Sequence, residues 1–160
     1  MVELAIRRLG PGDEAILTTL VVEGDRYAED GEDEHETPLG PADAIAFLAD
    51  PHTHLLIGFD AEAPDDAPPL GFVVANELRH RHSFGRMLIV YEIGVDRAVR
   101  RRGIGRALLD AVAQLARERD IPEGFVLTNA SNTAAMTLYA AAGGTRPSLD
   151  VVEWDFDYRS

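Results

Sequence analysis

The spacing of hydrophobic positions changes several times along the chain and predicts a series of strands and helices. Short apolar or β-branched stretches bounded by Pro, Gly or acidic residues are typical of strands, whereas apolar residues three and four positions apart are typical of helices. The predicted strands are 2–9, 54–60, 70–78, 87–95, 124–129 and 151–156, and the predicted helices are 13–22, 41–49, 104–119 and 131–142. This order predicts an α/β (α+β) sandwich in which helices pack on a mixed sheet.

Residue types at the helix ends support these boundaries. Asp13 and Ser131 are predicted N-caps, because a short polar side chain can accept a hydrogen bond from a free amide of the first turn. Pro41 suits the first turn of its helix, and Gly143 and Gly144 follow the last helix. The sequence of 160 residues contains no internal repeat or linker, so we expect a single domain over 1–160.

The strand 87–95 is nearly all apolar, and this predicts a central position in the sheet with both faces buried. Glu92 is the one carboxylate within it. A buried carboxylate is costly unless it has a partner or a chemical task. Desolvation would raise its pKa toward neutrality, which suits a general base. The alternative is that Glu92 forms a structural ion pair with a neighbouring arginine.

The charges are distributed unevenly along the chain. The net charge is −13 at pH 7, and all 15 basic residues are arginine. The segment 23–36 carries eight carboxylates and one arginine, whereas five arginines lie between 97 and 106. The negative body argues against nucleic acid as a partner and favours a cationic ligand. The compact positive segment predicts a second ligand of opposite charge.

Several classes of site and location are disfavoured by composition. Without cysteine, disulfides and thiolate chemistry are excluded. No stretch reaches the roughly 18 apolar residues of a membrane helix, and the first residues do not resemble a signal peptide. We therefore expect a cytoplasmic protein without membrane association. The pairs His52/His54 and His80/His82 have a spacing that could bind a metal from a strand, but solvated surface positions are the favoured interpretation, and no metal is expected.

The junction between strand 87–95 and the following helix carries the sequence RRRGIGR at 100–106. Amides at a helix start attract anions, glycines allow a ligand to approach the backbone, and arginines add charge. The pattern therefore predicts a phosphate or pyrophosphate site. It is not a Walker A loop, since no Gly-Lys-Ser/Thr follows, and it lacks the third glycine of the Rossmann fingerprint. The alternative is a tight turn with solvated arginines.

This junction resembles a known family signature. The pattern Arg100-x-x-Gly103-x-Gly105 is similar to the Q/R-x-x-G-x-G/A motif of the GNAT superfamily of N-acetyltransferases, which grips the pyrophosphate of acetyl-CoA. The segment from Asn129 to Tyr139 resembles the N-x-x-A-x-x-L-Y helix of the same family. The order of strands and helices is similar over nearly the whole chain. One departure is Gly-Gly at 143–144 where the family often has Gly-Phe, which removes a packing contact but no chemistry.

The resemblance implies a fold and a reaction. The fold would be a mixed, mostly antiparallel sheet of six to seven strands flanked by about four helices, and family members often form homodimers. The reaction would be acetyl transfer from acetyl-CoA to an amine in a ternary complex, with Glu92 as general base. Tyr139 would be the general acid for the leaving thiolate; the alternative is a core tyrosine. The implied cofactor-binding residues, including the strand amides that bind the pantetheine arm, are Ile93, Val95, Arg100, Arg101, Arg102, Gly103, Ile104, Gly105, Arg106, Asn132 and Ala135.

A closer resemblance concerns the acceptor. The segments VYEIGV at 90–95, RRGI at 101–104 and WDFD at 154–157 are similar to GNAT-type aminoglycoside 3-N-acetyltransferases. This implies a small cationic amine, such as an aminoglycoside acetylated at its 3-amino group. The predicted acceptor residues are Tyr27, Glu29, Asp30, His35, Glu153 and Asp155. Two alternatives stay open: a GNAT enzyme for another amine (a polyamine, a small metabolite or a protein N-terminus), and a non-catalytic regulator that binds acetyl-CoA.

Overall fold

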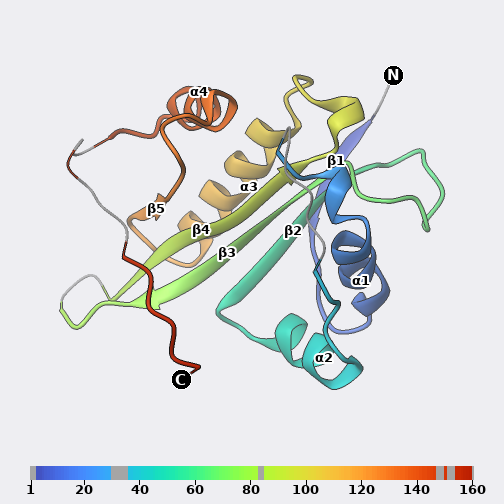
Figure 1. Ribbon diagram of the computed structural model, residues 1–160, viewed down its shortest axis with the longest axis horizontal. Helices are drawn as coiled ribbons and strands as arrows, with labels where there is room; N and C mark the ends of the chain where they lie inside the picture. The colour runs from blue at the N-terminus through green and yellow to red at the C-terminus, as the bar shows by residue number, and fades with distance from the viewer. Residues whose placement is uncertain (1–2, 30–35, 83–84, 147–149, 151–153, 160) are drawn as a thin grey trace.

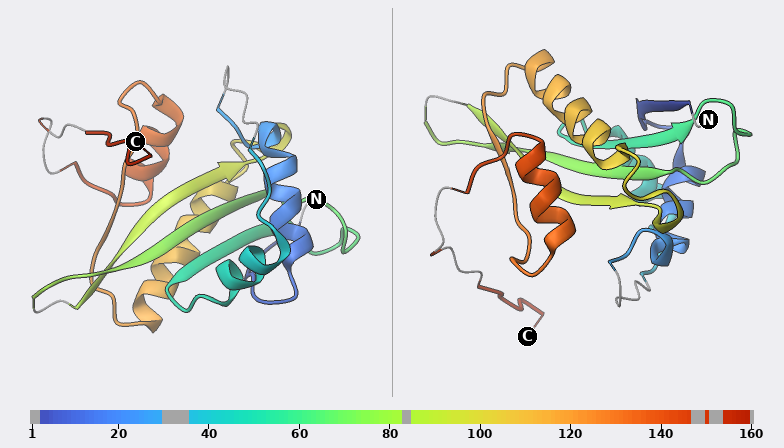
Figure 2. Two further views of the ribbon diagram at one scale, coloured as in Figure 1. Left: turned by 60° about the horizontal axis from the view of Figure 1, so that its bottom comes forward. Right: turned by 90° about the horizontal axis from the view of Figure 1, so that it is seen from above.

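The computed structural model describes residues 3–29, 36–82, 85–146, 150 and 154–159, and contains one five-stranded sheet with helices on both faces (Figures 1 and 2). The strand order is β1-β2-β3-β4-β5; neighbours are antiparallel except for β4 and β5, which are parallel. The strands are β1 (Leu4–Arg8), β2 (Thr53–Asp60), β3 (Gly71–Arg79), β4 (Arg86–Val95) and β5 (Gly124–Val126). The α-helices are α1 (Glu14–Val22), α2 (Pro41–Ala49), α3 (Ile104–Glu118) and α4 (Thr133–Ala141), and the 3₁₀ helices are η1 (Gly24–Arg26) and η2 (Arg97–Val99).

The sheet has a separate hydrophobic core on each face. Leu108 of α3 is fully buried together with Val73 and Ala75 of β3. On the opposite face, Leu20 of α1 is buried in a cluster that includes Leu55 of β2. Figure 2 shows α3 on one side of the sheet and α1 and α2 on the other. Successive residues of β2 and β3 therefore alternate between two apolar cores, which explains their nearly continuous apolar sequence.

The predicted α/β fold is confirmed, with differences at two helix starts. Asp13 occupies the predicted N-cap of α1, but its carboxylate accepts hydrogen bonds from the Gly10 amide and the Arg7 guanidinium instead. The prediction of Ser131 as the cap of α4 is wrong. Asn132 is the cap, because its side-chain oxygen accepts a hydrogen bond from the Ala135 amide at 3.0 Å.

Two predicted strands also differ from the structure. β5 ends at Val126 rather than at 129. For the predicted strand 151–156, residues 151–153 lie outside the described residues, and 154–159 form no regular structure. The described part of the chain therefore contains five strands rather than six to seven.

β4 and β5 stay paired over only a short distance. The parallel pairing covers Leu88 to Val90, and the chain after β5 turns away from β4 toward α4 (Figure 1). Beyond Val90, no described strand flanks β4 on its β5 side. The prediction that 87–95 is buried on both faces is therefore wrong for its second half, where Tyr91 is 68% exposed.

A β-bulge lies at the point where the two strands part. The register between β3 and β4 shifts so that Val90 pairs with Ala75 and Glu92 pairs with Val74, which leaves Tyr91 as an extra residue on β4. Such an insertion bends the strand and changes the face to which the following side chains point. The bulge thus separates a fully paired half of β4 from a half that borders open space.

Among the described residues, no helix combines the length and the apolar character that crossing a bilayer requires.

Candidate active site

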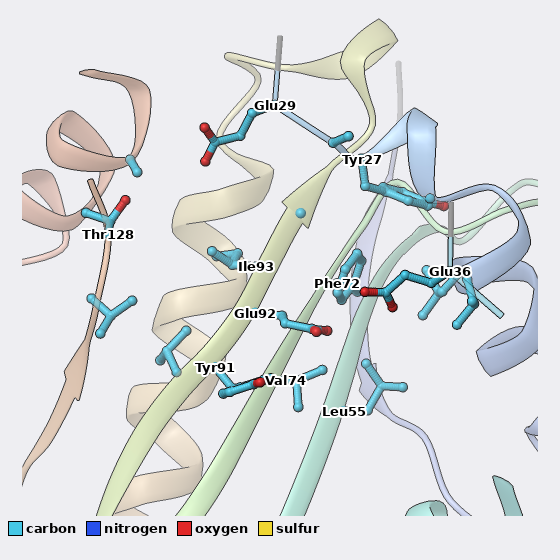
Figure 3. A pocket seen from close by; sticks show the side chains of 18 of the residues that line it. Tyr27, Glu29, Glu36, Leu55, Phe72, Val74, Tyr91, Glu92, Ile93 and Thr128 are labelled. Atoms are coloured by element: carbon cyan, nitrogen blue, oxygen red, sulfur yellow. The ribbon is translucent and has the colours of Figure 1, made fainter. Parts of the chain in front are cut away.

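A pocket of about 570 Å³ lies where β4 and β5 diverge. Its walls come from α1 and η1, from the first half of β3 and the second half of β4, and from β5 and α4 (Figure 3). Volumes of about 300–1,000 Å³ are typical of small-molecule sites. Much of the wall is apolar, including Phe72 and Val74 on β3 and Ile93 on β4. Its few charged groups are therefore the features that can select a ligand.

Three carboxylates line the pocket: Glu29 after η1, Glu36, and Glu92 on β4. Figure 3 shows Glu36 and Glu92 reaching toward the same space from different walls, while Glu29 is directed toward α4. The described residues of the lining include no arginine, lysine or histidine. This charge distribution favours a cationic ligand. Sequence reasoning did not single out Glu36, whose only signal was its place at the end of the acidic segment 23–36.

Glu92 lies on the pocket face of β4. Its register partner Val74 belongs to the core under α1 and α2, so Glu92 points to that side of the sheet rather than toward α3. The predicted burial of Glu92 is wrong: the side chain is exposed, because the pocket rather than a packed helix lies next to it. A carboxylate in this position can exchange protons with solvent, and its role as general base stays a prediction.

Tyr139 lies on α4 and lines the opposite side of the pocket. Its side chain is half-buried. Burial raises the pKa of its hydroxyl above the ordinary value, and the nearby Glu29 carboxylate raises it further. The phenol is therefore protonated at neutral pH and can donate a proton, as a general acid must.

Asn132 connects the two walls of the pocket. Its side-chain oxygen caps α4, while its side-chain nitrogen donates a hydrogen bond to the Glu29 carboxylate. Both residues line the pocket, as does Ala135. The structure thus brings the predicted acceptor residue Glu29 together with the predicted cofactor residues Asn132 and Ala135.

The divergence of the strands leaves backbone amides of β4 facing the gap. The Asp96 amide donates to the Leu70 carbonyl at 2.9 Å, on the β3 side. Amides along a strand alternate in direction, so those of Val95 and Ile93 point away from β3. Arg100 supports this assignment, because its Nε donates to the Val95 carbonyl from that side at 3.2 Å. These amides fit the predicted contact with an extended pantetheine arm.

The loop before α3 has an unusual backbone that suits an anion. Arg101 and Gly103 are in the left-handed region, with φ of 60° and 83°. Gly103 precedes the first turn of α3, where amides lack intrahelical partners. Gly105 also has a packing role, and its predicted contact with the cofactor stays a prediction. A Cβ atom there would lie 3.1 Å from the Leu138 side chain, so this glycine allows α3 to pack closely against α4.

The side chains of the predicted phosphate loop fall into two groups. Arg101 and Arg102 are exposed and make no hydrogen bond or ion pair with any described residue. Arg100 and Arg106 instead donate to backbone carbonyls, Arg106 to that of Ala141. The remaining member, Ile104, is buried in the core under α3 and can contribute only its backbone.

The predicted acceptor residues are only partly assembled at the pocket. Tyr27 lines it, but the residue is buried, its ring packs edge-on against Phe72, and its hydroxyl donates to the Pro69 carbonyl at 2.8 Å. Asp155 is exposed in the C-terminal segment and does not line the pocket. Three further predictions, Asp30, His35 and Glu153, lie outside the described residues.

The histidine pairs are not both solvated, contrary to the prediction. His54 is fully buried, and its Nε2 lies 2.8 Å from a Glu77 oxygen. His80 and His82 have neighbouring rings, and His80 lies 3.2 Å from Glu123. Within the described residues, no group of His, Cys, Asp and Glu has a geometry that could hold a metal ion.

Known structures share this architecture. An aminoglycoside acetyltransferase from an uncultured soil metagenomic sample matches with a TM-score of 0.82 at 24% identity, over 97% of this chain and 98% of that one. A second such enzyme, solved in complex with sisomicin, matches with a TM-score of 0.80 at 19% identity, over 96% and 95% of the two chains. At 19% and 24% sequence identity, this similarity establishes the shared fold alone.

Sequence comparison gives a shorter match and a family. The mycothiol acetyltransferase of Thermobispora bispora is 40% identical over 63 residues, which are 39% of this chain and only 21% of that protein. The acetyltransferase (GNAT) family model matches residues 22–143, a range that includes most of the pocket lining, the arginine-glycine loop and α4. The chain therefore belongs to the GNAT family of acetyltransferases.

Proposed function

We propose that this protein transfers the acetyl group of acetyl-CoA to an amino group of a small polycationic acceptor, an aminoglycoside in the first instance. The observation that carries the acceptor class is the pocket lining, with three carboxylates and no basic side chain among its described residues. Carboxylates bind ammonium groups by charge and by hydrogen bonding. The aminoglycoside acetyltransferases of similar fold, one of them with sisomicin bound, support the same class.

The residues around the pocket fit acetyl-CoA. The left-handed turn at Gly103, the amides at the start of α3 and the exposed Arg101 and Arg102 would hold the pyrophosphate. The outward amides of Ile93 and Val95 would bind the pantetheine arm. The thioester of bound acetyl-CoA would supply the activated acetyl group. Lining residues of the pocket then determine which amine reaches it.

The proposed reaction needs one proton acceptor and one proton donor. Glu92 takes a proton from the acceptor ammonium, directly or through a water molecule. The amine nitrogen then attacks the thioester carbonyl; a C–N bond forms and the C–S bond breaks. Tyr139, whose raised pKa keeps its phenol protonated at neutral pH, gives that proton to the departing sulfur. The acetylated nitrogen then passes its second proton through water to the Tyr139 phenolate, and Glu92 releases its proton to solvent, which restores both residues.

The test is thiol release from acetyl-CoA with gentamicin, kanamycin, spermidine and a basic peptide as separate acceptors. Turnover with an aminoglycoside supports the proposal, and NMR of the product then decides whether the 3-amino group is the acetylated position. Turnover with spermidine or the peptide alone would keep the reaction and reject the aminoglycoside. Acetyl-CoA binding without turnover on any acceptor would favour a non-catalytic regulator.

A further inference from the structure

Two arginines hold three consecutive carbonyl groups at the end of η1. Nη2 of Arg100 donates to the carbonyls of Ala28 and Tyr27 at 2.5 and 3.4 Å. Arg97 donates from Nε to the Ala28 carbonyl at 3.2 Å and from Nη2 to the Glu29 carbonyl at 2.8 Å. The two guanidinium groups thus share the Ala28 carbonyl and hold the backbone on both sides of it.

The same short segment is fixed at two more points. Nη1 of Arg26 lies 2.8 Å from the buried Asp96 carboxylate, directly after β4. The Tyr27 hydroxyl donates to the Pro69 carbonyl at 2.8 Å, just before β3. Residues 26–29 are therefore attached through backbone and side chains to the ends of the two central strands. This attachment determines where the Glu29 side chain begins.

Glu29 occupies the boundary between the two halves of the pocket. Its backbone carbonyl is bound by Arg97, and its carboxylate accepts a hydrogen bond from Asn132 at the start of α4. The same carboxylate acts on the hydroxyl of Tyr139, whose pKa it raises. Figure 3 shows the Glu29 side chain extending from the η1 side of the pocket in the direction of α4. The Glu29 carboxylate thus contacts Asn132, a residue predicted to meet acetyl-CoA.

The arginine contacts bear on the predicted role of Arg100 in phosphate binding. Two nitrogens of its guanidinium donate to carbonyls of Val95, Tyr27 and Ala28. To bind phosphate with those nitrogens, Arg100 would have to give up these bonds. Arg101 and Arg102 are exposed and have no such bonds to lose among the described residues.

We infer that Arg97 and Arg100 are positioning residues for acceptor selection: they hold the backbone of residues 27–29 so that the Glu29 carboxylate meets an ammonium group of the acceptor beside the reacting thioester. This inference rests on the proposed function. The arginine-rich segment then has two functions: Arg97 and Arg100 act on the acceptor side, and Arg101 and Arg102 supply charge for the cofactor phosphates.

Arginine and lysine variants separate these two functions. A planar guanidinium has several N–H donors and can bridge two carbonyls. A lysine ammonium keeps the charge but lacks this planar set of donors. We expect Arg97→Lys and Arg100→Lys to raise the acceptor KM about tenfold, the scale of one lost charge-assisted hydrogen bond. Their Kd for acetyl-CoA, measured by calorimetry, should stay within about twofold of the wild type. Arg101→Ala is the matched control and should show the opposite split, a raised acetyl-CoA Kd with an unchanged acceptor KM.

A double-variant cycle tests whether the effect passes through Glu29. If the arginines act by holding this carboxylate, Arg100→Lys should add little to the KM of Glu29→Gln, since coupled residues are not additive. A wild-type KM for Arg100→Lys, a raised acetyl-CoA Kd in the same variant, or full additivity with Glu29→Gln would each overturn the inference.

A readout that does not need turnover distinguishes failure of the inference from failure of the proposed function. Hydrogen exchange should be faster at the amides of residues 24–29 in Arg97→Lys and Arg100→Lys than in Arg101→Lys. If the wild-type protein acetylates no amine, the proposed function fails, and equal exchange in all three variants would reject the positioning role independently.

Discussion

The two ends of α3 lie beside two very different groups of carboxylates. At its C-terminal end, Glu77 of β3 is buried and accepts hydrogen bonds from Arg119, Arg86 at 2.7 Å and His54 at 2.8 Å. His52 lies on the same carboxylate at 3.2 Å. At the N-terminal end, the three carboxylates of the pocket share walls whose described residues include no basic side chain.

The difference separates a structural carboxylate from carboxylates available to a ligand. Burial alone would raise the pKa of Glu77, but the hydrogen bonds from Arg119, His54, Arg86 and His52 outweigh it and hold the pKa well below its usual range. A charge neutralised in this way fixes β2, β3, β4 and the end of α3 together. A carboxylate that lines a pocket of about 570 Å³ can instead exchange its neighbours for those of a ligand.

The largest effect on stability is expected at Glu77, beside the C-terminal end of α3. Glu77→Ala would leave Arg119, Arg86 and His54 around a position without a compensating charge. Removing one partner of a buried ion pair costs several kcal/mol, and we expect a loss of about 3 kcal/mol in the free energy of unfolding, since both arginines can partly regain water. Urea denaturation measures it. Glu62→Ala, in the exposed loop between β2 and β3, is the control and should change stability by less than about 0.5 kcal/mol.

A substitution in the pocket should instead lower activity and leave stability nearly unchanged. Glu92→Gln is expected to lower kcat about a hundredfold or more, the usual contribution of a general base. Its free energy of unfolding should stay within about 0.5 kcal/mol of the wild type, because the side chain is exposed. Steady-state kinetics and urea denaturation of the same sample measure both. Glu36→Gln is the comparison variant, expected to raise the acceptor KM with little change in kcat; equal kcat in the two variants would contradict the role of Glu92.

A smaller effect is expected from the backbone at the N-terminal end of α3. Gly103→Ala places a Cβ on a residue with φ of 83° and should cost about 1 kcal/mol of stability. Gly143→Ala is a matched control, since Gly143 has φ of 90° and open space around it. Both variants should lose similar stability, but only Gly103→Ala should weaken acetyl-CoA binding in calorimetry. Equal acetyl-CoA affinity in the two variants would contradict a role of the Gly103 loop in cofactor binding.

The smallest effect is a dependence of stability on pH that arises from His54 and Glu77. Burial lowers the pKa of His54, and its bond to Glu77 offsets this only in part. The unfolded chain therefore binds a proton that the folded protein does not, so this stabilisation is complete above about pH 6.5 and is lost as the pH falls. Glu77 adds a further loss below about pH 4.3, because its pKa is depressed in the folded protein. Urea midpoints between pH 8 and pH 5 should fall less in His54→Gln than in the wild type; parallel curves would contradict the assignment.

Much of the fold and part of the site followed from local sequence patterns. The spacing of hydrophobic positions and the residue types at the element ends predicted the helices and the first four strands, because these signals act within a few residues. The turn at Gly103 was predictable for the same reason. The family resemblance, rather than physical pattern, pointed to Tyr139 and Asn132.

What could not be predicted depends on distant pairing. The buried contact of His54 with Glu77 requires the register between β2 and β3, and no local pattern reveals it. Arg100 was expected at phosphate; in the structure it binds the carbonyls of Tyr27 and Ala28, which lie 73 and 72 positions away in the sequence. Glu36 lacks any motif, and only the folded chain shows that it shares a pocket with Glu92.

The bulge at Tyr91 has a consequence for how β4 tolerates change. Before the bulge, Leu88 and Val90 face α3, and after it Ile93 and Val95 do. Strict alternation through the same residues, without the bulge, would turn Glu92 into the core beneath α3 and carry Ile93 to the opposite face. Conservative replacements along the strand would leave this arrangement intact. The chemistry of this end of the sheet thus depends on the place where β4 accommodates its extra residue as much as on its composition.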